Sequence, residues 1–212
     1  MNIGFLGDSI TLGYALSDRS KRYSTLICEQ LHATEVNHGI TGTLVARAGL
    51  NTSDGLDYVS RLHLILDCDV AVIFGGTNDY FWSDKPILGD DDSYFDHAME
   101  TIAKEIVKAR AGRITLIVTP YPHNGIGNFL GGDGWRASSR HDTSQKNYNG
   151  ETLSDYVNST VRICEKYGLH YLNLHKDFGF DWRLHTSDGC HPNEEGHKIL
   201  AKVIGARLRE LI

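Results

Sequence analysis

Short apolar runs rich in β-branched residues recur along the chain and predict buried strands. The two clearest runs occupy 70–74 (VAVIF) and 114–118 (ITLIV), and runs at 2–6 and 171–174 share their character. A weaker run at 35–37 adds a fifth candidate. Continuous apolar runs of this length are typical of strands that are covered on both faces, as in a parallel sheet.

Segments with the helical spacing of apolar residues separate most of these runs. Two of the predicted helices begin with a Ser or Thr that is followed three residues later by Asp, which is the pattern of a capping box. The first begins at Ser93 and continues until Gly112, and the second begins at Thr152 and stops at Gly168. Further helices are predicted at 23–31, at about 54–66 and at 193–211.

This alternation of strands and helices predicts a single domain over residues 1–212, built as a three-layer α/β/α sandwich with right-handed crossovers. Ligands of such folds bind at the carboxyl ends of the strands. One segment, 121–150, lacks both periods and is rich in Gly, Ser, His and Asn. Loops this long are usually functional or disordered. We expect this loop to form a wall or lid of the cleft, and a disordered insertion or a subunit contact are the alternatives.

The composition favours a globular protein that acts on a small molecule. Hydrophobic residues make up 41% and charged residues 23%, and the formal net charge is -6. Nucleic acids and anionic membranes are held by clustered Lys and Arg, which this sequence lacks, so neither is an expected partner. No apolar stretch reaches the roughly 18 residues of a membrane span, and residues 1–9 do not resemble a signal peptide, so a cytoplasmic location is expected. The sequence does not indicate an oligomeric state.

Sequence motifs for metals and nucleotides are missing. The cysteines at positions 28, 68, 164 and 190 show no CxxC spacing, and free thiols are favoured over two disulfides. There is no HExxH motif, so no metal site is predicted. Without GxGxxG or GxxxxGK[ST], a nucleotide-binding regulator is the weakest of the functional hypotheses.

Three short motifs follow predicted strands or precede the last predicted helix. Ser9, in GDSIT, could present its hydroxyl at the carboxyl edge of the sheet, and Asn78, in GGTND, could donate its amide N–H to a developing negative charge. Asp188 and His191, in DGCHPN, are spaced to meet across a turn, as a general base and its orienting carboxylate must. Each motif alone has an ordinary explanation, namely a helix cap, an Asx turn, and a turn residue beside a loop histidine.

Together, in this order, the motifs resemble those of the SGNH (GDSL-like) hydrolase superfamily. The resemblance implies a five-stranded, flavodoxin-like sheet, no cofactor, and an enzyme that hydrolyses esters. It assigns the nucleophile to Ser9, and the other members of the triad, Asp188 and His191, to the block DGCHPNEEGH.

The same resemblance implies an oxyanion hole of three donors. The backbone N–H groups of Ser9 and Gly42 and the side-chain amide of Asn78 are expected to supply them. Gly42 lies in the block NHGITG, which is the poorest match to the family pattern, and Gly39 is the alternative to it.

The expected reaction is hydrolysis of an O-acyl ester through an acyl-enzyme. Similarity to the carbohydrate-esterase branch, in the loop that begins at Tyr121 and the helix entry at Thr152, favours an acetyl group on a carbohydrate. A lysophospholipase or thioesterase is the enzymatic alternative, and a non-hydrolytic binding or acyl-transfer module is the other. The residues expected to contact the substrate are Asp8, Trp82 and Trp135.

Overall fold

The structure, a computed structural model, describes residues 1–47, 55–124, 144, 146–176 and 178–212. Its five parallel strands form one sheet in the order β2-β1-β3-β4-β5. This order is that of flavodoxin-like folds, and it confirms the predicted α/β architecture. The strands are Asn2–Gly7 (β1), Thr34–Gly39 (β2), Val70–Phe74 (β3), Ile114–Val118 (β4) and His170–Leu172 (β5).

The strands are buried because successive side chains enter two different cores. In β1, Ile3 and Phe5 pack into one core and Leu6 into the other. Val72 and Ile73 divide in the same way in β3. The period of two therefore does not appear as an alternation of apolar and polar residues, since both faces of the sheet are covered.

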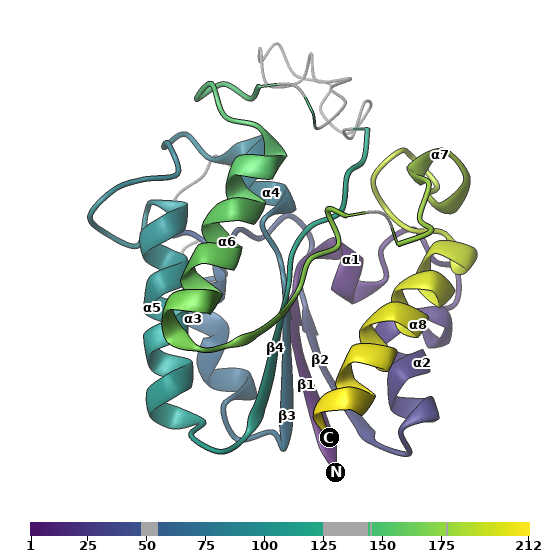
Figure 1. The fold of residues 1–212 in the computed structure, drawn as a ribbon. Coiled ribbons are helices and arrows are strands. Elements are labelled where there is room, and N and C mark those ends of the chain that lie inside the picture. The colour runs from purple at the N-terminus through teal and green to yellow at the C-terminus, as the bar shows by residue number, and fades with distance from the viewer. Residues whose placement is uncertain (48–54, 125–143, 145, 177) are drawn as a thin grey trace.

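Helices form the two outer layers, as Figure 1 shows. On one face lie α2 and α8, and on the other lie α3, α5 and α6, each with its apolar side in the core of that face. The bounds are Tyr23–Gln30 (α2), Tyr58–Arg61 (α3), Phe95–Ala109 (α5), Leu153–Tyr167 (α6) and Glu194–Leu211 (α8).

Two of the predicted helix starts are confirmed. At α6 the Thr152 and Asp155 side chains form the expected capping box, and Gly168 ends the helix in the left-handed region. At α8 the side chain of Asn193 accepts the N–H of Gly196, as an N-cap should.

The other predicted capping box is wrong. Helix α5 begins at Phe95, after Tyr94, which makes no side-chain capping bond. Ser93 donates its N–H to Asp91, and the Asp96 carboxylate is taken by Ser159 of α6. The helix predicted at 54–66, of which position 54 lies outside the described residues, contains a shorter α-helix than expected. After the four residues of α3 the chain continues as a 3₁₀-helix at Leu62–Ile65.

Three short helices lie at the carboxyl edge of the sheet, where a ligand is expected (Figure 1). They are α1 (Ser9–Leu12), α4 (Thr77–Trp82) and α7 (Trp182–His185). A 3₁₀ turn, Arg19–Lys21, precedes α2. Among the described residues no helix combines the length and the apolar character that crossing a membrane requires.

Most of the predicted loop at 121–150, including Trp135, lies outside the described residues. Of its described part, Tyr121 is fully buried and donates its hydroxyl to the carbonyl of Cys190 at 2.7 Å. The start of the loop is therefore anchored beside the C-terminal motif.

Candidate active site

Ser9 is the first residue of α1, directly beyond the end of β1. The preceding residue, Asp8, caps this helix by accepting the N–H of Ile10 at 2.9 Å. A Cβ on Gly39, at the end of β2, would collide with the backbone of Leu12. Glycine at this position therefore lets the nucleophile helix lie directly against the neighbouring strand.

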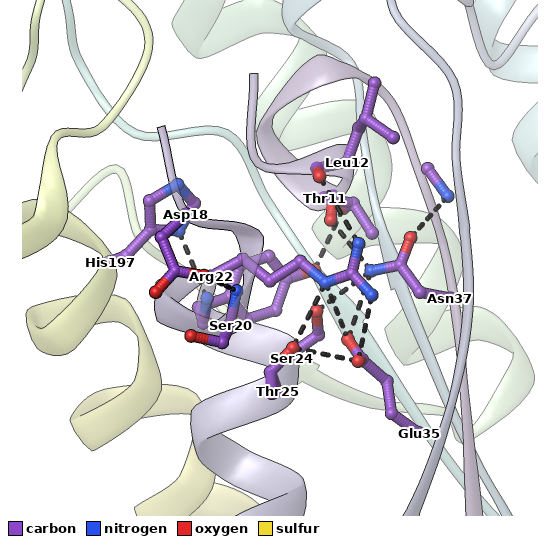
Figure 2. Close-up of polar contacts among 12 residues, drawn as sticks. Thr11, Leu12, Asp18, Ser20, Arg22, Ser24, Thr25, Glu35, Asn37 and His197 are labelled. Atoms are coloured by element: carbon purple, nitrogen blue, oxygen red, sulfur yellow. Dashed lines mark hydrogen bonds and ion pairs between the residues drawn. The ribbon is translucent and has the colours of Figure 1, made fainter. Parts of the chain in front are cut away.

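A polar network contacts the last carbonyl groups of α1 (Figure 2). The side-chain amide of Asn37 donates to the Thr11 carbonyl at 2.8 Å. Arg22 reaches the Leu12 carbonyl at 3.5 Å and forms a two-point ion pair with Glu35, with N–O distances of 3.0 and 2.9 Å. Because a four-residue helix has little stability of its own, these outside donors to its last carbonyls hold it in place.

The geometry of the predicted triad is compact. The Ser9 Oγ lies 3.0 Å from Nε2 of His191, and Nδ1 of the same ring lies 2.6 Å from Oδ2 of Asp188. A carboxylate can only accept, so Nδ1 carries the ring proton and Nε2 is free to accept the hydroxyl proton of Ser9. The structure thus brings together three residues that lie up to 182 positions apart in the sequence.

The turn that carries Asp188 and His191 is bonded along its whole length. Oδ1 of Asp188 accepts the N–H groups of Cys190 and His191 at 3.0 and 2.8 Å. Gly189 has φ +95, and a Cβ there would lie 2.7 Å from the carbonyl oxygen of Asn124. The turn therefore requires glycine both for its backbone angle and for this close approach.

Electrostatics keep Asp188 ionised. Burial alone would raise its pKa, but the hydrogen bond and the charge of His191, with the two backbone N–H donors, outweigh burial and lower the pKa to about 2. Asp188 therefore stays a carboxylate at neutral pH, and it can stabilise an imidazolium on His191.

The candidate oxyanion donors differ in whether their N–H groups are already engaged. Among the described residues, no acceptor takes the backbone N–H of Ser9 or that of Gly42. The N–H of Gly39 is already donated to Oδ1 of Asn37 at 2.9 Å. These contacts favour Gly42 over Gly39 as the second donor.

Asn78 lies in the first turn of α4, after Gly76 at φ +107. Its Nδ2 donates to the Thr43 carbonyl at 3.0 Å and makes a long contact, 3.4 Å, with the Asp8 carboxylate. One N–H is therefore committed to holding the side chain, and the other is only weakly engaged. A buried amide in this state can turn a donor toward negative charge.

Two buried aspartates lie beside these donors. Burial raises the pKa of Asp8 to about 6, although the Ile10 N–H and the charges of His191 and Arg61 favour the carboxylate. Burial likewise raises the pKa of Asp79 to about 7, against the N–H groups that it accepts from Val45 and Ala46. Within the described part of the chain, no group of three or more His, Cys, Asp or Glu could hold a metal ion.

A comparison of the sequence with models of protein families shows the family to which the chain belongs. The model of the GDSL-like lipase/acylhydrolase family matches residues 5–199, which include every motif residue above. The chain belongs to this family. This acylhydrolase is accordingly a hydrolase of carboxylic esters. A comparison with curated proteins found no significant match.

Solved structures of low sequence identity share the fold of the acylhydrolase. A possible lipase from Chitinophaga pinensis is 19% identical, with TM-score 0.75 and coverage of 99% of this chain and 98% of that one. The M. smegmatis aryl esterase is 17% identical, with TM-score 0.72 and coverage of 100% and 99%. A carbohydrate acetylesterase from Sinorhizobium meliloti is 16% identical, with TM-score 0.70 and the same coverage.

Of the three residues predicted to contact the substrate, two are buried in the acylhydrolase and one lies outside the described residues. Asp8 is 2% exposed and its carboxylate is used within the protein. Trp82 is 6% exposed, at the end of α4. Trp135 lies outside the described residues. A role in substrate contact remains a prediction for all three.

Sequence reasoning missed two residues of this region. The half-buried ring of Tyr14 lies with its centroid 4.6 Å from that of His191, and Arg61 is buried beneath the turn that carries Gly42. An aromatic residue just after GDSIT was the available signal for Tyr14, although the sequence does not show which way its ring points. For Arg61 no motif in the sequence provided a signal.

Proposed function

We propose that this acylhydrolase removes a short acyl group, foremost acetyl, from the oxygen of a small or carbohydrate ester. The observation that carries the proposal is the pair of contacts from His191, to Ser9 Oγ at 3.0 Å and to Asp188 at 2.6 Å. In this arrangement His191 can take the proton of Ser9 while Asp188 holds the ring in the required tautomer.

The proposed mechanism proceeds through an acyl-enzyme. Oγ of Ser9 bonds to the ester carbonyl carbon as Nε2 of His191 takes the hydroxyl proton, and the carbonyl π electrons move to oxygen. Collapse of this intermediate breaks the bond to the alcohol oxygen, which receives the proton from the imidazolium. Water then attacks the acyl-enzyme in the same way, releases the acid and restores Ser9.

The negative oxygen of the tetrahedral intermediate would be met by the donors described above. The N–H groups of Ser9 and Gly42 belong to the backbone, and the Asn78 amide is held by the Thr43 carbonyl, so little reorganisation would be needed when charge develops. Ser9 and Asn78 are buried, which strengthens the interaction of their N–H groups with a charge.

Two features support a short acyl group. Ser9, Asn78 and His191 expose 6%, 3% and 3% of their surfaces, which favours a compact group at the reacting carbon. Two proteins with the same fold are named as a carbohydrate acetylesterase and an aryl esterase. A flat ring beside the site, that of Tyr14, offers a surface on which a sugar or aryl group can stack.

The test compares 4-nitrophenyl acetate, butyrate and octanoate with an acetylated sugar as substrates of the intact protein. We expect kcat/KM to be highest for the acetate and acetic acid to be released from the sugar. A preference for octanoate would instead assign a lysophospholipase-like or thioesterase-like specificity. Acylation of Ser9 without turnover of any ester would identify an acyl-transfer or binding module.

Replacing Asn78 by Ala should lower kcat by about 100- to 1,000-fold with little change in KM, because one preorganised donor to the oxyanion is lost. Steady-state kinetics with 4-nitrophenyl acetate measures both constants. The matched control is Asn149→Ala. Like the Asn78 amide, the Asn149 amide donates to the backbone, here to the carbonyls of Ser83 and Lys85 just after α4. A loss that appears almost wholly in KM would make Asn78 a ground-state binding residue instead.

A further inference from the structure

A buried arginine lies beneath the proposed oxyanion hole, and the inference drawn from it rests on the proposed function. Arg61, the last residue of α3, is only 4% exposed. Among the described residues, no carboxylate lies within ion-pair distance of its guanidinium. A buried charge is costly unless its donors are satisfied, so the acceptors of this group show what its burial achieves.

Arg61 has four acceptors in the part of the chain that the structure describes, and three of them lie on the segments that carry the reacting groups; the fourth is the carbonyl of Leu56, just before α3, which Nε reaches at 2.6 Å. Its Nη2 donates to the carbonyl of Gly7 at 3.3 Å, at the end of β1 and two residues before the nucleophile. Its Nη1 donates to the carbonyl of His38 at 2.6 Å, near the end of β2. Nη2 also donates to Oγ1 of Thr43, the residue after Gly42, at 2.9 Å. One rigid, planar group thus links both strand ends to the turn with the candidate donor.

Thr43 transmits this fixation to the neighbouring peptide. Besides accepting from Arg61, its hydroxyl donates to the Ile40 carbonyl at 2.9 Å, which closes the turn around Gly42. Its own carbonyl accepts the amide of Asn78 at 3.0 Å. Gly42 itself has φ +76, and among the described residues its N–H has no acceptor. The bonds to Thr43 therefore hold the residue that directly follows Gly42, and they restrict the turn in which the Gly42 N–H lies.

We propose that Arg61 is a positioning residue of the oxyanion hole, which holds the Gly42 N–H and the end of β1 in the relative placement that the tetrahedral intermediate requires. It does not touch the substrate. Its effect on the reaction passes through Thr43 and through the carbonyl of Gly7.

A second buried arginine allows the structural and positioning roles to be separated. Arg110 is 2% exposed, and its guanidinium also donates to backbone carbonyls, among them those of Ile65, Cys68 and Ile114 at 3.0, 2.8 and 2.8 Å. These carbonyls lie at the opposite edge of the sheet, where β3 and β4 begin. Arg110 is therefore matched to Arg61 in burial and in bonding, and it is remote from Ser9.

The experiment compares Arg61→Met with Arg110→Met. Thermal unfolding gives the stability of each variant. The kinetic constants kcat and KM are measured with 4-nitrophenyl acetate, and kcat is calculated per folded molecule from the folded fraction of each sample. Both variants should lose stability. Only Arg61→Met should lower kcat per folded molecule, by about 10- to 100-fold with KM changed less than about threefold, because misplacement of a reacting group by about 1 Å can cost about 100-fold.

A second variant keeps the test decisive if Arg61→Met does not fold. Thr43→Val keeps Arg61 and the shape of the side chain at position 43, but it removes the hydroxyl that accepts the guanidinium of Arg61. This variant should also lower kcat. Unchanged kcat in Thr43→Val and in any folded Arg61 variant would overturn the inference. Fluorophosphonate labelling of the wild-type protein is measured first. A wild type that is not labelled at Ser9 refutes the proposed function, whereas a labelled wild type with unaffected variants refutes only the role of Arg61.

Discussion

Replacing Ser9 by Ala should lower ester turnover by about 10⁶-fold and abolish covalent labelling by a fluorophosphonate. The physical reason is that the Ser9 hydroxyl lies 3.0 Å from a histidine nitrogen that can take its proton. Without that base a serine hydroxyl is a poor nucleophile. Intact-mass analysis measures the labelling, and initial rates with 4-nitrophenyl acetate measure the turnover.

Ser159→Ala is the control for this prediction. Ser159 is buried, at 7% exposure, but its hydroxyl donates to the Asp96 carboxylate in the interface of α5 and α6 and not to a histidine nitrogen. Its removal should leave both labelling and turnover intact. Labelling that persists at full stoichiometry in Ser9→Ala would show that another residue is the nucleophile.

The double variant Asp188→Asn/His191→Ala should be no slower than His191→Ala alone. We expect about 10⁶-fold loss for His191→Ala and about 10⁴-fold for Asp188→Asn, because Asp188 acts only by orienting and charging the base that His191 provides. Once the base is gone, its orienting group has nothing left to act on. The measurement is kcat for the wild type and the three variants in a double-mutant cycle.

Asparagine is the suitable replacement at position 188, because its oxygen can still accept the N–H groups of Cys190 and His191 that close the turn. Circular dichroism tests whether the variants at Asp188 and His191 are folded. Losses that multiply in the double variant would mean that the two residues do not work as one unit.

The core strands were predictable because the information that specifies them is local. A run such as VAVIF at β3 can be satisfied only where both faces are covered, and the structure places it in the middle of the sheet. The capping box at Thr152 and the cap at Asn193 are equally local, since each bonds to a backbone group three residues away. These predictions are confirmed.

The error at Ser93 has a non-local cause. The spacing of Ser93 and Asp96 was correct for a capping box, but Ser159 and Arg162 of α6 occupy the Asp96 carboxylate. A local pattern cannot predict a stronger partner that arrives from a distant segment. In the helix predicted at 54–66, the part that the structure describes, from residue 55 on, is α-helical at Tyr58–Arg61 alone.

By itself the sequence determined the α/β class, the bounds of β3 and β4 and the motifs that follow the strands, because buried runs and short motifs depend on neighbours along the chain. Tertiary structure decided how far apart the groups lie and which of them are engaged. It placed His191 between Ser9 and Asp188, occupied the N–H of Gly39 and left that of Gly42 without an acceptor among the described residues. It also seated the guanidinium of Arg61 beneath the site. The reason is that hydrogen bonds compete for partners in three dimensions, so the partner a polar group finds depends on every segment that folds against it.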